Sequence, residues 1–113
     1  MTKSLEVLQQ VFGFEDFRSL QKKIINSIIS GEDNFVLMPT GGGKSLCYQI
    51  PSLVREGVGI IVSPLISLMQ DQVQALKANG VSAAFYNSSL NEEDSRAILS
   101  KLHNNALDLL YIA

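Results

Sequence analysis

The sequence has 113 residues, of which 46% are hydrophobic and 18% are charged, and its formal net charge is −2. This composition is typical of one soluble globular domain, and the sequence holds neither a membrane-spanning run nor the apolar core of a signal peptide. The acidic balance argues against a protein that grips nucleic acid by bulk electrostatics. The single cysteine, Cys47, excludes an internal disulfide and a cysteine-based zinc site, so we expect a cytoplasmic protein.

Residues 1–33 are predicted to form two amphipathic helices. Apolar spacing places the first at about Ser4 to Phe12 and the second at about Ser19 to Ser30, and glycines end both. The expected apolar faces comprise Leu5, Leu8 and Phe12 in the first helix, and Leu20, Ile24 and Ile28 in the second. These helices precede the expected start of a parallel-sheet core in residues 34–113.

The core is predicted to begin with a strand over Asn34–Met38 and a glycine-rich loop, Pro39-Thr40-Gly41-Gly42-Gly43-Lys44-Ser45. Glycines allow several backbone N–H groups to point at one anion, and a helix that starts after the loop favours phosphate. Lys44 would place its charge on the outer phosphates, and the Ser45 hydroxyl would bind Mg²⁺. The strict phosphate-loop pattern has glycine where Met38 stands, and a simple strand-to-helix turn is the alternative.

The rest of the sequence alternates helix and strand signals, which predicts a parallel sheet covered by helices. Pro51 is expected to kink or end the next helix near Ile50, and strand 59–62, apolar on both faces, is expected at the sheet centre. The expected elements are helix 43–53, strand 59–62, helix 64–79, strand 83–86, helix 91–104 and strand 109–113. The inward positions of the last two helices are Leu65, Leu68, Met69, Val73 and Leu76, and then Ile98, Leu99 and Leu102.

Three side chains upstream of the glycine loop could bind a nucleotide base. An aromatic ring and a guanidinium plane, here Phe14 and Arg18, can sandwich adenine, and the Gln21 amide can pair with its edge. If the second helix begins at Arg18, then Arg18 and Gln21 share one helical face. An ordinary polar surface turn explains the same residues when they are considered without the loop.

Ser63-Pro64-Leu65 is predicted to be an N-cap, a proline at the first helical position and the start of a helix. Backbone N–H groups at such a start suit a nucleic-acid phosphate, and a capped helix without a ligand is the alternative. The polar run Asn87-Ser88-Ser89 also follows a strand, but strand-to-helix loops are usually polar.

With these motifs in place, the sequence resembles the first motor domain of RecQ-type DNA helicases in helicase superfamily 2, from about Val7 to Ala113. The resemblance rests on four stretches, which are Phe12 to Gln21, Met38 to Pro51, Ser63 to Val73 and Leu109 to Ala113. It implies a three-layer αβα, RecA-like P-loop fold with a mostly parallel sheet that is incomplete at the C-terminus. One departure is Ser19-Leu20, where the family has Pro-Gly.

The resemblance also implies roles. ATP would be held by Phe14, Arg18, Gln21, Thr40, Gly41, Gly42, Gly43, Lys44 and Ser45, with Lys44 catalytic and Mg²⁺ on Ser45. Ser63, Pro64 and Leu65 would touch DNA, along which such motors move in the 3′-to-5′ direction during recombination and repair.

The sequence lacks the family's Asp-Glu-Ala-His motif and its second motor domain, so we expect the chain alone to hydrolyse no ATP. A truncated, non-catalytic nucleotide-binding module and a DEAD-box RNA helicase are the alternatives. Against the RNA helicase, Ser63-Pro64-Leu65 stands where Pro-Thr-Arg-Glu-Leu is expected.

Overall fold

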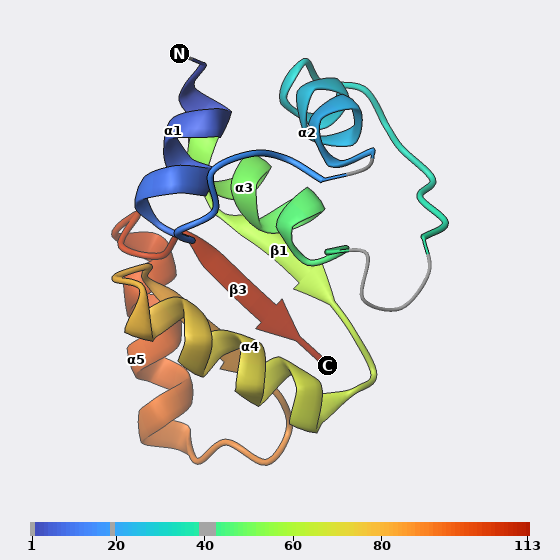
Figure 1. The fold of residues 1–113 in the computed structure, drawn as a ribbon. Coiled ribbons are helices and arrows are strands. Elements are labelled where there is room, and N and C mark those ends of the chain that lie inside the picture. Colours follow the sequence, from blue (N-terminus) through green and yellow to red (C-terminus); the bar gives the residue numbers. More distant parts are fainter. Residues whose placement is uncertain (1, 19, 39–42) are drawn as a thin grey trace. The chain divides into compact units, whose positions relative to one another are not determined.

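The computed structural model describes residues 2–18, 20–38 and 43–113. Within these residues the chain forms five α-helices and three β-strands, in the order α1, α2, α3, β1, α4, β2, α5 and β3 (Figure 1). Residues 1–56 form one compact unit and residues 57–113 form another. The alternation of helices and parallel strands confirms the predicted α/β class.

Residues 1–56 are built on three helices: α1 (Lys3–Gln10), α2 (Gln21–Ile29) and α3 (Leu46–Val54). Both α1 and α2 pack on α3, and each of the three helices contributes one buried side chain to the core, namely Leu8, Ile25 and Ile50. Leu5 and Phe12 pack against this core, as predicted. Leu20, expected on the inner stripe, is 56% exposed because α2 begins one residue after it.

The strand predicted at Asn34–Met38 is absent from the structure. Residues 34–38 form no ladder, and the side chains of Phe35 and Leu37 are 96% and 88% exposed. A strand exists only where a neighbour accepts its backbone hydrogen bonds. The described strands pair only with one another, within residues 57–113, so apolar β-forming side chains alone do not make this segment a strand.

Of the two outcomes predicted for Pro51, a kink or an early end of the helix, the early end is wrong. Helix α3 continues to Val54, with Pro51 inside it. The ring removes one intrahelical N–H donor, but Pro51 is fully buried, and the Ser52 hydroxyl donates to the Tyr48 carbonyl at 2.7 Å. We attribute the continuity of the helix to this packing.

Residues 57–113 contain a parallel sheet of three strands, β1 (Gly59–Val62), β2 (Ala83–Tyr86) and β3 (Leu109–Ile112), in the order β1-β3-β2 (Figure 1). Strand β3 lies between the others, and its Leu109, Leu110 and Tyr111 are buried. The prediction that 59–62 is central is wrong, because β1 is an edge strand whose Val62 is 77% exposed. The apolar sequence of β1 did not reveal its position in the sheet.

Helix α4 (Ile66–Ala78) links β1 to β2, and α5 (Glu92–His103) links β2 to β3. These two crossovers run in opposite directions across the sheet, and the right-handed rule then places their helices on opposite faces, as a three-layer αβα fold requires. The inward stripe of α4 is confirmed for Met69, Val73 and Leu76, whereas Leu65 and Leu68 are exposed because they lie at the helix start.

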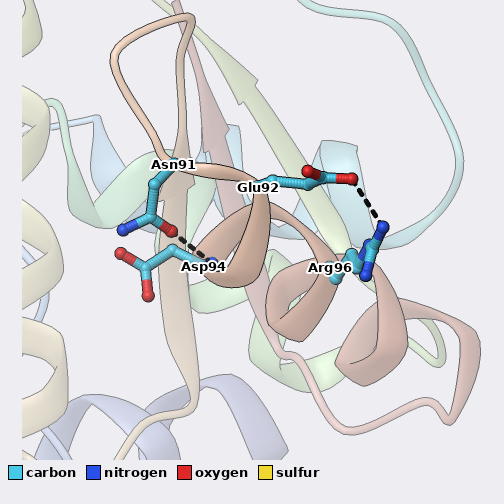
Figure 2. A network of polar contacts seen from close by, with 4 residues as sticks. All are labelled: Asn91, Glu92, Asp94 and Arg96. Atoms are coloured by element: carbon cyan, nitrogen blue, oxygen red, sulfur yellow. Dashed lines mark hydrogen bonds and ion pairs between the residues drawn. The ribbon is translucent and has the colours of Figure 1, made fainter.

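Helix α5 begins where its charges favour a helix start. The Asn91 side chain accepts the Asp94 backbone N–H at 2.7 Å, and Glu92 pairs with Arg96 one turn along (Figure 2). The acidic first turn complements the positive end of the helix dipole. Leu99, predicted to face inward, is 49% exposed, and no residue of α5 is fully buried.

Candidate nucleotide-binding site

The turn between α1 and α2 presents the first two predicted base-binding side chains. Gly13 adopts φ of 77°, a left-handed conformation that glycine accepts without strain, and the chain turns back after α1. The Phe14 N–H donates to the Leu8 carbonyl at 3.2 Å, which attaches the turn to α1. The Phe14 ring is 49% exposed and Arg18 is exposed, so both could contact a ligand.

Gln21 is the third predicted base-binding residue, and the structure buries it to 2% exposure. Its Oε1 accepts the Arg18 backbone N–H at 2.8 Å, while its own backbone N–H donates to the Arg18 carbonyl at 3.0 Å. Helix α2 thus begins at Gln21 rather than at Arg18 or Ser19, and residue 19 lies outside the described part. The three-residue spacing reflects this reciprocal pair, which resembles a capping box, and not a shared helical face.

The same carboxamide contacts the glycine loop. The Gln21 Nε2 donates to the Gly43 carbonyl at 3.2 Å, across 22 positions of sequence. Gly43 has φ of 76°, and a Cβ built on it would collide with Gln21 Nε2. Glycine is therefore favoured at position 43, because another residue would be strained at this φ and its Cβ would displace the Gln21 carboxamide. The structure brings the base-binding motif and the end of the loop together through this one side chain.

The predicted phosphate-binding residues fall partly inside the described structure. Thr40, Gly41 and Gly42 lie outside the described residues, whereas Gly43, Lys44 and Ser45 lie within them. Lys44 is exposed, and Ser45 is the N-cap residue of α3 without a capping hydrogen bond from its side chain. The ammonium group and the hydroxyl therefore stand at a helix N-terminus, where backbone N–H groups and the helix dipole favour an anion.

Cys47 lies in the first turn of α3 and is 4% exposed. Its Sγ lies 3.9 Å from the Gly43 carbonyl, the same acceptor that Gln21 contacts. Burial raises the pKa of the Cys47 thiol, so the thiol stays protonated at neutral pH. Cys47 therefore packs as a small buried residue.

The predicted DNA-binding segment follows β1. The Ser63 N–H donates to the Ile112 carbonyl at 2.9 Å and extends the ladder, while its hydroxyl accepts the Leu65 N–H at 3.1 Å. Leu65 has φ of −96° and ψ of 84°, which is not helical, so α4 begins at Ile66. The predicted N-cap at Ser63 with Pro64 as the first helical residue is wrong, because the Ser63 hydroxyl closes a local turn instead.

Asn87 and Ser89 make a similar local turn after β2, where the Asn87 Oδ1 accepts both the Ser89 N–H and its hydroxyl. Among the described residues, no group of three or more His, Cys, Asp or Glu side chains is arranged to hold a metal ion. Nor does any helix in the described ranges have the length and apolar character needed to cross a membrane.

Comparison with known proteins places the chain in a family. The DEAD/DEAH box helicase family matches residues 18–113, a range that includes the Arg18–Gln21 pair, the glycine loop and the whole sheet. The chain belongs to this family. A RecA-like motor fold accounts for the parallel sheet and for the glycine-rich sequence that precedes α3.

The similar proteins include ATP-dependent DNA helicases named RecQ, RecS and Q1. The chain is 49% identical over 110 residues to the ATP-dependent DNA helicase RecQ of Haemophilus influenzae, covering 97% of the chain and 18% of the relative. It is 52% identical over 104 residues to the probable ATP-dependent DNA helicase RecS of Bacillus subtilis, and this match covers 91% of the chain and 21% of the relative. It is 44% identical over 112 residues to the mouse ATP-dependent DNA helicase Q1, and this match covers 97% of the chain and 17% of the relative.

These matches confirm the predicted RecQ resemblance. The chain spans only about a fifth of the length of these relatives, and it corresponds to the N-terminal part of the motor domain.

Proposed function

We propose that this chain is the ATP-binding part of a RecQ-type DNA helicase, which couples ATP hydrolysis to 3′-to-5′ unwinding of DNA in recombination and repair. The relatives supporting this are named ATP-dependent DNA helicases. The observation that carries the proposal is the Gln21 carboxamide, which joins the Arg18 backbone to Gly43 of the phosphate loop. We also propose a bacterial-type cytoplasm as its location, because bacterial proteins named RecQ and RecS are among its relatives.

We assign the base to the turn at residues 13–18. The exposed ring of Phe14 and the guanidinium of Arg18 would stack on the faces of adenine. A carboxamide has two donors and two acceptor lone pairs, and Gln21 uses one of each on backbone groups. The second donor and the second lone pair would pair with the edge of adenine, so one side chain serves base and loop together.

We assign the phosphates to Thr40, Gly41, Gly42 and Gly43, with Lys44 and Ser45. The exposed Lys44 ammonium would contact the outer phosphates, and the Ser45 hydroxyl would be a ligand of Mg²⁺, since no helix cap occupies it. Mg²⁺, when bound, would neutralise part of the charge of the phosphates. Because Lys44 would contact the phosphates that react, it is the catalytic residue that we assign to this chain.

DNA is assigned to Ser63, Pro64 and Leu65 and the start of α4. The first intrahelical hydrogen bond described there runs from the Met69 N–H to the Leu65 carbonyl. The N–H groups of Ser63 and Leu65 already donate within the protein and Pro64 has none, so the groups offered to DNA are the N–H groups of the first turn of α4, residues 66–68. Such groups suit the phosphates of a DNA strand. Contact through a few backbone amides is compatible with the acidic net charge of −2.

The direct test is titration of the 113-residue chain with Mg²⁺-ATP, followed by calorimetry or by fluorescence of a labelled nucleotide. We expect saturable binding and no steady-state hydrolysis. Lys44→Ala should weaken binding by roughly 10-fold or more, because it removes a charge-assisted hydrogen bond. Lys77→Ala, at an exposed lysine in α4, is the matched control and should leave affinity unchanged. Failure to bind ATP, or hydrolysis that depends on Lys44, would contradict the proposal for this chain.

A further inference from the structure

The turn at residues 13–18, which we call the adenine platform, is attached to α1 at two successive residues. The Phe14 N–H donates to the Leu8 carbonyl at 3.2 Å, and the Gln9 Nε2 donates to the Glu15 carbonyl at 2.9 Å. One bond is between backbone groups, and the other is made by a side chain. The two bonds fix the backbone on both sides of the Phe14 Cα.

This attachment matters because burial does not hold the Phe14 ring. The ring is 49% exposed, and residues 13–18 form no helix or strand that would impose a direction on it. The direction of an exposed side chain follows from the backbone that carries it. Gln9 contributes the only described side-chain hydrogen bond to the backbone between Phe14 and Phe17.

Helix α1 is in turn fixed against the phosphate-binding helix. Leu8, next to Gln9, is fully buried and belongs to one core cluster with Ile50 of α3. Helix α3 begins at Leu46, directly after Lys44 and Ser45. All of these groups lie within residues 1–56, so α1 connects the adenine platform to the phosphate-binding residues through one packed core.

We propose that Gln9 is a positioning residue for adenine recognition. It touches neither the base nor the phosphates, and it acts by holding the Glu15 carbonyl so that Phe14 presents its ring at the correct place. The inference rests on the proposed ATP-binding function. It predicts that the Gln9 hydrogen bond contributes to the binding of the base but not to the binding of the phosphates.

The test compares two ligands, Mg²⁺-ATP and Mg²⁺-tripolyphosphate, which has no base. Gln9→Glu keeps the size of the side chain but removes the donor and puts a carboxylate against the Glu15 carbonyl. We expect it to weaken ATP binding about 3- to 10-fold, the range of one net hydrogen bond, with tripolyphosphate affinity unchanged. Gln9→Met, which loses the donor without adding charge, should show the same difference between ligands.

Gln10→Glu is the matched control. Gln10 is the next residue of α1, is exposed and makes no described side-chain hydrogen bond, so its substitution adds the same charge near the same helix end. It should change neither affinity. Gln9→Lys offers a donor again and should recover most of the ATP affinity.

The outcomes separate this inference from the proposed function. Equal ATP affinities for Gln9→Glu and Gln10→Glu would overturn the positioning role alone. So would an equal loss for both ligands in Gln9→Glu and Gln9→Met, because that result indicates general loss of structure. If the unsubstituted chain binds tripolyphosphate but not ATP, the adenine platform itself is wrong, and if it binds neither, the proposed function is wrong.

Discussion

In residues 1–56 the described ATP-binding candidates lie on turns and helix ends, whereas in residues 57–113 the proposed DNA-binding groups follow a strand of a parallel sheet. The first unit is held by helix packing around Leu8, Ile25 and Ile50 and by a few specific hydrogen bonds. The second depends on a central strand that pairs on both sides. Both units have a buried core, but only the second places its candidate ligand groups by a repeating ladder.

The difference predicts how each unit responds to substitution. A ladder distributes its stabilisation over many equivalent backbone bonds, so no single bond should dominate. Its stability should instead be sensitive to how the side chains of the central strand pack. A site on turns depends on individual contacts, such as the one from Gln21 to Gly43, so single atoms should matter there. Three substitutions test this comparison.

The largest effect is expected in the sheet. Leu109 is fully buried in β3 and lies in register with Gly59 of β1 and Ala83 of β2. Leu109→Ala should lower the free energy of unfolding by about 2–5 kcal/mol, because it leaves a cavity in the core that covers one face of the sheet. Urea unfolding combined with hydrogen exchange of the strand amides measures this loss.

Leu99→Ala is the control, since Leu99 is 49% exposed on α5. It should change stability by less than about 1 kcal/mol, as surface substitutions usually do. If the two variants lose the same stability, then residues 57–113 do not depend on the central strand, and the comparison between the units fails.

Much of this fold could be predicted from residue patterns. The bounds of strands 59–62 and 83–86 are confirmed, because short apolar runs between turn residues fit few other elements. The prediction that the last helix begins near Asn91 is also confirmed, since Asn91 is the N-cap of α5 and a capping side chain acts locally. Positions that depend on distant partners were not predictable. The pattern of 34–38 is that of a strand, yet a ladder requires a neighbour that no local pattern supplies.

In the candidate site, too, local features could be predicted from the sequence and contacts between distant residues could not. Phe14, Arg18 and Gln21 could be selected from their spacing before a phosphate loop, but not the contact between Gln21 and Gly43, which joins residues far apart in sequence. Gln9 carried no signal at all, because a glutamine near the end of an amphipathic helix is ordinary surface chemistry. The helix start at Ile66 was missed because Ser63 can cap a helix or close a turn with the same hydroxyl.

The second prediction concerns the single contact that joins the platform to the loop. Gly43→Ala should be destabilising for two reasons, its φ of 76° and the collision of the new Cβ with Gln21 Nε2. Gly31→Ala shares only the first reason, because Gly31 has φ of 96° and no atom within 4 Å of the built Cβ. We expect a loss of about 1–2 kcal/mol for Gly31→Ala and about 1 kcal/mol more for Gly43→Ala, from the lost buried hydrogen bond.

Thermal and urea unfolding of both variants, with ATP titration, measure these effects. Only Gly43→Ala should weaken ATP binding, since only that substitution displaces Gln21. Equal stability and equal ATP affinity in the two variants would show that the Gln21 contact is not what places the loop, and that backbone conformation suffices.

The smallest effect is expected at the start of α5, where one side chain satisfies one backbone group. Asn91→Ala removes the acceptor of the Asp94 N–H (Figure 2) and should lower the free energy of unfolding by about 1 kcal/mol. Arg96→Ala is the control, because it removes only the exposed pair with Glu92 and should change stability by less than about 0.5 kcal/mol. High salt should reduce the effect of Arg96→Ala but not that of Asn91→Ala, since the cap is a short-range hydrogen bond. A larger loss for Arg96→Ala would mean that charge, rather than capping, fixes where this helix begins.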